Sequence, residues 1–156
     1  MKKFISLTLV VCALVASLSA LAIVPVSVFV NGEKVQIPEG DVCAQIINNS
    51  TMIPMRNIFE ELGANLNWIA SAQSIIATKG SKIIAMKVGS TKMTVTDALT
   101  GENVVKTLPV APMMITAENK EAYGARTVVP LRAISESLNK KVDWDGETYT
   151  VTITDK

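Results

Sequence analysis

The sequence of 156 residues contains no histidine and only two cysteines. Without imidazole, the chain cannot form a copper site with imidazole ligands, the commonest zinc sites or a histidine general base. A catalytic cysteine would lack its usual activating partner, so Cys43 is better interpreted as a small buried hydrophobic residue. These absences weigh against a metal-dependent or histidine-dependent enzyme.

The sequence also lacks an excess of either charge. Lys and Arg number 15 against 14 Asp and Glu, which leaves a formal net charge of +1. Binding to nucleic acid or to an anionic membrane surface needs a concentrated basic face, and nothing in this balance indicates one. We therefore expect no nucleic-acid partner.

The N-terminus has the features of a secretory signal peptide. Lys2 and Lys3 form a basic region, residues 4–16 are uncharged and apolar, and Ala-Leu-Ala at 20–22 is a cleavage site of the small-x-small type. We therefore expect residues 1–22 to be removed on export.

An uncleaved membrane anchor is the alternative, because no charged residue occurs from 4 to 30 and this length can span a bilayer. With either outcome, residues 23–156 are expected to be secreted or exposed on the extracytoplasmic cell surface. Contact with the membrane is expected only if the N-terminal segment stays uncleaved, and then only through that segment. Once the signal peptide is removed, Cys43 is the only cysteine, so no internal disulfide can form.

A block of the sequence recurs 76 positions later without a gap. Residues 51–68, TMIPMRNIFEELGANLNW, return as residues 127–144, TVVPLRAISESLNKKVDW. The matching pairs are Thr51/Thr127, Pro54/Pro130, Arg56/Arg132, Ile58/Ile134, Glu60/Glu136, Leu62/Leu138 and Trp68/Trp144. Duplication of this kind is typical of one supersecondary unit used twice. We predict one domain at 23–156 made of two half-repeats, at about 24–80 and 81–156.

Each block predicts a short helix. In the first, Ser50 or Thr51 is expected to cap the helix, Pro54 to occupy its first position and Gly63 to end it in the left-handed conformation. Apolar residues follow at i, i+3, i+4 and i+7, which gives one buried face. The second block has the same pattern, with Asn139 in place of Gly63.

The rest of the chain predicts strands. Alternating apolar residues at 26–37 surround Asn31-Gly32, which favours a hairpin with a type I′ turn. Further strands are expected in the ranges 42–47, 74–78, 83–88, 92–96, 104–108 and 149–154, and around Trp68 and Trp144. The predicted fold class is α+β: two repeated units of antiparallel strands and hairpins, each packed on one short helix.

Two motifs give the chain a resemblance to a known family. Residues 53–68 and 129–144 share the pattern apolar-Pro-[Leu/Met]-Arg, an amphipathic helix, Gly or Asn, and a strand with Trp, and VFVNGEKV precedes them. This pattern resembles the copper amine oxidase N-terminal-like family, also called stalk domains, over about residues 26–154. The first copy departs from it, with Asn67 and Ile69 where acidic residues commonly flank the Trp.

The resemblance implies a small antiparallel sheet wrapped on a helix, used as a non-catalytic stalk or appended module of exported bacterial proteins. The oxidase chemistry of that family lies in a different domain, whose cofactor arises from a Tyr in an Asn-Tyr-Asp/Glu setting. Tyr123 follows Ala and Tyr149 lies between two threonines, so neither fits. We therefore expect no cofactor and no catalysis.

Arg56, Arg132, Trp68 and Trp144 are the candidate site residues. A structural role is favoured for the arginines, in which the guanidinium ties the helix start to loop carbonyls or to an acidic strand residue. The alternative is a carboxylate-binding groove. Alternation along the strands favours a core position for the tryptophans over a sugar-stacking platform.

Other side chains that could bind a metal ion have simpler structural explanations. The six methionines after Met1 lack the dense clustering of Cu(I) sites and favour core filling. Asp143-x-Asp145-Gly146 suggests a calcium loop, but the position of the bidentate Glu is a Thr, so a tight turn is expected. No metal site is predicted.

The sequence favours a non-catalytic, stalk-like module at the bacterial cell surface, acting in structural support, adhesion or assembly. One alternative is a module that binds cell-wall glycan or peptide, and its partner would be a cell-wall polymer or another envelope protein. A second is an exported hydrolase using carboxylates such as Glu60/Glu61 or Asp143/Asp145. A solvated helix face and a turn explain those carboxylates better.

Overall fold

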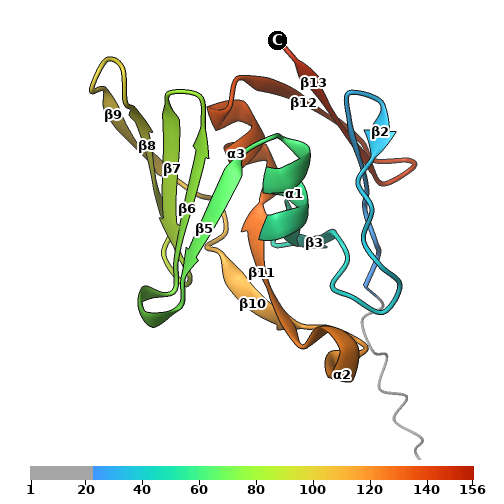
Figure 1. Ribbon diagram of the computed structural model, residues 1–156. Coiled ribbons are helices and arrows are strands. Elements are labelled where there is room, and N and C mark those ends of the chain that lie inside the picture. Colours follow the sequence, from blue (N-terminus) through green and yellow to red (C-terminus); the bar gives the residue numbers. More distant parts are fainter. Residues whose placement is uncertain (1–22) are drawn as a thin grey trace, which may run out of the picture.

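The computed structural model describes residues 23–156, so the predicted signal peptide at 1–22 lies outside the described residues. The described chain is mostly β, with three β-sheets and three short α-helices, which agrees with the predicted α+β class (Figure 1). None of these helices is long and apolar enough to cross a membrane.

A four-stranded antiparallel sheet lies at the centre, in the order β10-β11-β4-β3. Its strands are β3 (Gln45–Ile47), β4 (Ser50–Pro54), β10 (Met113–Thr116) and β11 (Ala125–Pro130). Ile53 of β4 stands opposite Val129 of β11, and both side chains are fully buried. These two residues are also matched by the 76-residue offset, so the strand pairing is centred on one pair of corresponding positions.

The two blocks run from strand directly into helix. Helix α1 (Met55–Glu61) follows Pro54, and helix α3 (Leu131–Ser137) follows Pro130. The prediction that Ser50 or Thr51 caps the first helix is wrong, because β4 includes both residues and no side chain caps α1. Pro54 also lies outside the helix: its φ of −53° and ψ of 127° are extended, which continues the pairing with β11.

The predicted helix ends are confirmed. Gly63 has a φ of +69° and Asn139 a φ of +59°, so both adopt the left-handed conformation that stops a helix. The hairpin turn is also confirmed, with φ values of +50° at Asn31 and +88° at Gly32.

Two outer sheets flank the helices. The larger is an antiparallel sheet in sequence order: β5 (Asn65–Ile69), β6 (Ser74–Lys79), β7 (Lys82–Lys87), β8 (Lys92–Asp97) and β9 (Asn103–Thr107). The smaller has the order β12-β13-β1-β2, with β12 (Lys140–Asp145), β13 (Thr150–Asp155), β1 (Ser27–Val30) and β2 (Glu33–Lys34). In it the first strand, β1, runs parallel to the last, β13. A 3-10 turn, η1 (Ala70–Ala72), joins β5 to β6, and helix α2 (Lys120–Tyr123) joins β10 to β11.

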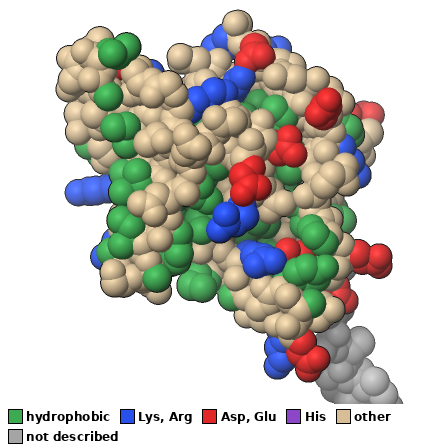
Figure 2. All heavy atoms as spheres, in the orientation of Figure 1, with side chains coloured by type: hydrophobic (Ala, Val, Ile, Leu, Met, Phe, Trp, Pro, Cys, Tyr) green, Lys and Arg blue, Asp and Glu red, His purple; other side chains and the backbone are tan. Residues whose placement is uncertain are grey.

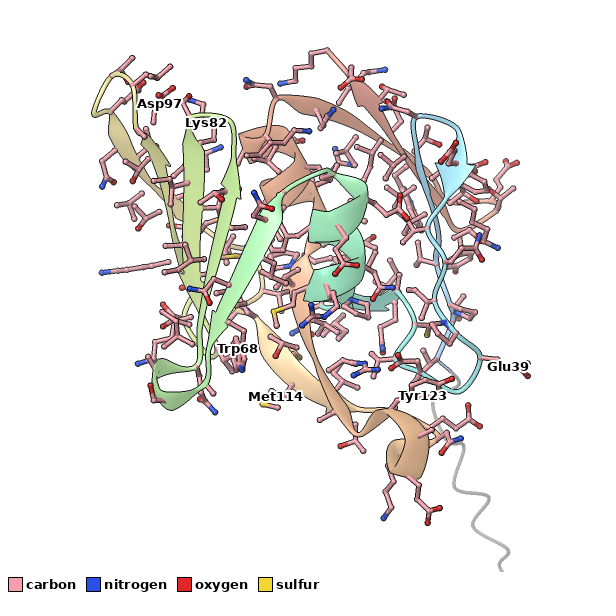
Figure 3. All side chains as sticks on the ribbon, in the orientation of Figure 1. Glu39, Trp68, Lys82, Asp97, Met114 and Tyr123 are labelled. Atoms are coloured by element: carbon pink, nitrogen blue, oxygen red, sulfur yellow. The ribbon has the colours of Figure 1, made fainter. Side chains whose placement is uncertain are left out.

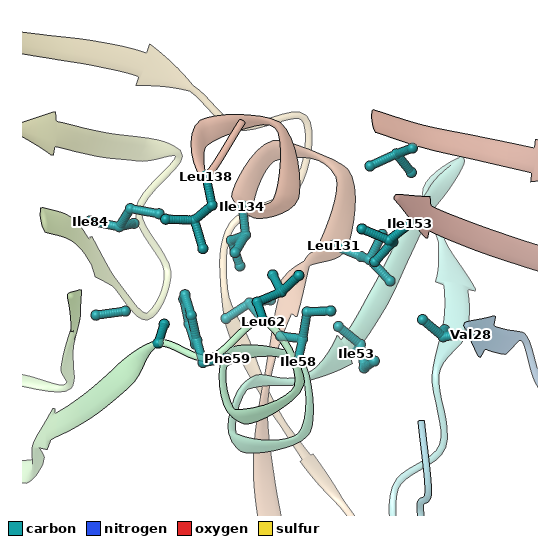
Figure 4. Packing of buried hydrophobic residues seen from close by; sticks show 14 of the residues in the cluster. Val28, Ile53, Ile58, Phe59, Leu62, Ile84, Leu131, Ile134, Leu138 and Ile153 are labelled. Carbon is teal, nitrogen blue, oxygen red and sulfur yellow. The ribbon is translucent and has the colours of Figure 1, made fainter. Parts of the chain in front are cut away.

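The core fills the space between the outer sheets. Figure 4 shows Ile58 and Phe59 of α1 against Leu131 and Ile134 of α3, with Ile84 of β7 on one side. All five side chains are buried. A second, smaller buried cluster includes Met52 and Val128 of the central sheet, together with Val42, Val110 and Ala117. The helices therefore join the sheets by burial of their apolar faces.

We expect Phe59→Ala to lower the free energy of unfolding by about 3–5 kcal/mol, because it leaves a cavity between α1 and the larger sheet. Urea denaturation measures the change. Leu99→Ala is the control: Leu99 is exposed in the loop after β8, and its truncation should change stability by no more than about 0.5 kcal/mol. Equal effects of the two substitutions would contradict this packing.

Candidate functional site

Two grooves of similar size open beside the central sheet, with volumes of about 440 and 460 Å³. We call them the Trp144 groove and the Trp68 groove. The Trp144 groove is lined by Ile46, Asn49, Ser50, Thr51, Pro130, Leu131, Arg132, Val142, Trp144, Tyr149 and Val151. The Trp68 groove is lined by Pro38, Asp41, Pro54, Met55, Arg56, Asn57, Trp68, Met114, Ala125, Arg126 and Thr127.

The four candidate residues therefore line two separate grooves, one Arg and one Trp in each. Seven positions in each groove correspond by the 76-residue offset: Asn49, Ser50, Thr51, Pro130, Leu131, Arg132 and Trp144 in one, and Ala125, Arg126, Thr127, Pro54, Met55, Arg56 and Trp68 in the other. The Thr of each groove comes from the opposite block, because β4 and β11 pair antiparallel. Each groove is thus built from both blocks.

The Trp144 groove has an exposed aromatic wall. Trp144 and Tyr149 are each 41% exposed, and their rings meet edge to face with centroids 5.8 Å apart. Ile46 is an exposed apolar residue on the same groove. The expectation that Trp144 lies in the core is wrong: it follows Val142 on the same face of β12, but beyond the end of the buried cluster.

Tyr149 stands in the turn before β13 with a φ of +51°. This conformation is uncommon for a bulky side chain, and such residues are found most often at turns and functional sites. The sequence shows a Tyr between two threonines, with no local signal that it would join Trp144 at a groove.

The two candidate arginines have different surroundings. Nη1 of Arg132 donates to the Val142 carbonyl at 2.8 Å and lies 3.4 Å from Glu136. Arg132 thereby links the start of α3 to β12, and its side chain is still 54% exposed. Among residues 23–156, the ion-pair partner of Arg56 is Glu60 alone, at 3.5 Å, and the Arg56 side chain is 69% exposed. Exposed pairs of this kind contribute little to stability.

The Trp68 groove is closed at one wall by an ion pair. Trp68 is partly buried against the main core, and Met114 is exposed beside it; Figure 3 shows both between the larger sheet and β10. Nε and Nη2 of Arg126 each donate to the carboxylate of Asp41 at 2.9 Å. These hydrogen bonds raise the pKa of Arg126, and its guanidinium also lies 5.7 Å from the Tyr123 ring centre. Sequence reasoning missed this pair, because its members are distant in the chain.

The remaining candidate groups, two carboxylates and a thiol, take part in local contacts or are partly buried. Asp145 accepts hydrogen bonds from the Thr148 hydroxyl at 2.7 Å and the Glu147 amide at 2.9 Å, which lower its pKa and close the predicted turn. Asp143 pairs with Lys141 at 2.8 Å. Cys43 is half-buried, and burial raises the pKa of its thiol, which disfavours the thiolate.

Residues 23–156 contain no group of three or more acidic or cysteine side chains placed to hold a metal ion. On the face shown in Figure 2, acidic and basic side chains lie together near the centre, and no region of a single charge stands out. This surface gives no sign of steering toward a highly charged partner.

Comparison with protein families matches residues 29–153 to the model described as copper amine oxidase N-terminal domain. The match spans both blocks and both grooves. Comparison with curated proteins found no match, and comparison with solved structures found none either.

We expect Arg126→Ala to lower the free energy of unfolding by about 1–3 kcal/mol, because the buried carboxylate of Asp41 would lose its charged donor. Arg56→Ala is the matched control in the same groove and should cost at most about 1 kcal/mol, since its ion pair is exposed. Chemical denaturation of both variants measures the difference, and a larger loss for Arg56→Ala would contradict the structural role of Arg126.

Proposed function

The chain belongs to the copper amine oxidase N-terminal domain family, and we propose that it is a non-catalytic module that holds a partner at the cell surface. The domain that gives the family its name is the non-catalytic N-terminal domain of amine oxidases. The grooves support a binding role: the Trp144 groove has no carboxylate among its lining residues, and the only one in the Trp68 groove, Asp41, is held by Arg126.

We propose that the module acts outside the cytoplasm of a bacterium, in structural support, adhesion or assembly. The basic residues, apolar run and small-x-small site at 1–22 support export. A signal peptide that stays uncleaved would instead anchor the chain to the membrane.

We further propose that the two blocks are copies of one folding unit. Three observations support duplication: the gap-free 76-residue offset, the pairing of Ile53 with Val129 at its centre, and the corresponding residues that line the two grooves. Strands β6 and β13 also begin at positions 74 and 150, which differ by the same offset.

We expect the exported protein to lack residues 1–22. Intact-mass measurement of protein recovered from outside the cytoplasm should give a chain starting at Ile23, and cell fractionation should find it away from the cytoplasm. A full-length mass in the membrane fraction would indicate an anchor, and a cytoplasmic location would refute the proposed site of action.

The Trp144 groove favours one ligand class for a binding role, the pyranose rings of a cell-wall glycan. Trp144 and Tyr149 offer exposed aromatic faces against which sugar rings can pack. Asn49, Ser50 and Thr51 line the same groove and carry amide and hydroxyl groups that can bond sugar hydroxyls. Arg132, already anchored to β12, presents its guanidinium beside them.

We expect Trp144→Ala to weaken retention on purified peptidoglycan about tenfold or more, because a central Trp carries a large share of binding energy at such sites. Trp68→Ala is the matched control at the corresponding position of the other groove and should bind like the unchanged protein. Pull-down with quantified unbound protein measures both.

The same pull-down on glycan strands stripped of stem peptides distinguishes the ligand. Retention on the stripped strands supports the glycan. Retention only on intact material indicates a peptide instead, and equal binding by the Trp144 and Trp68 variants would contradict the assignment to this groove.

A further inference from the structure

The last strand of the larger sheet, β9, is an exposed edge. It pairs with β8 on one side, and no described residue pairs with its other side. Four of its five residues are exposed, and Val105 is 63% exposed, an unusual position for a β-branched apolar residue. An edge strand of this kind presents free backbone donors and acceptors to another strand.

The pairing with β8 fixes which backbone groups are free. The Asp97 amide donates to the Glu102 carbonyl, and the Leu108 amide donates to the Thr91 carbonyl. Hydrogen-bonded pairs alternate along an antiparallel ladder, so the amides and carbonyls of residues 104 and 106 point toward β8. Those of Asn103, Val105 and Thr107 point away from the sheet.

The side chains divide in the same alternating way. Glu102, Val104 and Lys106 share the inner face of the sheet, where they line a shallow pocket of about 160 Å³ with residues of α3 and the turn after it. Val105 lies on the opposite face. A Glu and a Lys therefore stand on one face, on either side of Val104.

We propose that β9 pairs antiparallel with β9 of a second copy of the chain, with Val104 on the two-fold axis, and joins the two larger sheets into one. This register uses the free backbone groups, because Asn103 of each copy meets Val105 of the other. It also places Glu102 of each copy opposite Lys106 of the other, so that two oppositely charged pairs form across the interface.

Other registers that pair the same free backbone groups do not place opposite charges across from one another. Centring on Val105 places Lys106 opposite Val104, and centring on Asn103 places Glu102 opposite Val104. Centring on Lys106 brings two lysines together. A charge on an edge strand ordinarily discourages pairing, but here one register turns both charges into partners.

Contacts within the same chain hold β9 and the loop before it in position. Lys106 Nζ donates to the Ser137 hydroxyl at 2.9 Å, which ties β9 to α3. The loop before β9 is fixed by Asp97, whose carboxylate accepts from the Leu99 amide at 2.9 Å and pairs with Lys82 at 3.0 Å. These contacts lower the pKa of Asp97 to about 2, so the loop keeps this charge over the range of ordinary pH.

Sedimentation equilibrium of the exported chain over a concentration series tests the proposal, with a doubling of mass expected at high concentration. Glu102→Lys and Lys106→Glu should each raise the dimer dissociation constant at least tenfold, because each sets like charges opposite one another. The double variant Glu102→Lys/Lys106→Glu should restore the dimer. Leu99→Lys, which changes an exposed loop residue outside the strand, should leave it intact.

Val105→Pro gives a second test that does not depend on charge. The Val105 amide faces away from β8, so proline removes a donor that the monomer does not use. The dimer should be lost while the circular dichroism spectrum and melting temperature of the monomer are kept. A monomer at every concentration, a folded double variant that fails to dimerise, or a dimer that survives Val105→Pro would each overturn the proposal.

Discussion

The antiparallel pairing of β4 with β11 is the contact on which the rest of the structure depends. Ile53 and Val129 face each other at its centre with no exposure to solvent. Each strand ends in a proline and continues at once into a helix, so the pairing also sets where α1 and α3 begin. Figure 1 shows both helices between the outer sheets, which they join through their apolar faces. Separation of these strands would divide the core.

The same pairing explains why the grooves occur in two versions. In each groove, a Thr from one block lies with the Pro, Arg and Trp of the other. Two features differ between the grooves. Tyr149 extends an aromatic wall in one, whereas Arg126, at the position that matches Ser50, pairs with Asp41 and closes a wall in the other. The grooves therefore share lining positions matched by the 76-residue offset and differ in the chemistry they offer.

Much of the local structure could be predicted, because its causes are local. Gly63, Asn139 and Asn31-Gly32 adopt the conformations that their backbone preferences favour. Prediction failed where pairing between distant segments decides the outcome. Residues 50–54 carry a helix-start pattern but form a strand because β11 is available beside them. Trp144 alternates like a core residue, yet β12 continues beyond the core, and no spacing connects Asp41 with Arg126.

The parallel pairing of β1 with β13 has a consequence for a chain held under tension. Ser27 lies beside Thr150 and Val30 beside Ile153, so the two strands run side by side in the same direction. A pull applied to the chain entering β1 and the chain leaving β13 acts along the strands, in opposite senses. Because the force runs along the strands and across the backbone hydrogen bonds between them, those bonds are loaded together in shear and do not open one at a time. Tension along the chain would therefore be resisted by the whole β1–β13 ladder at once.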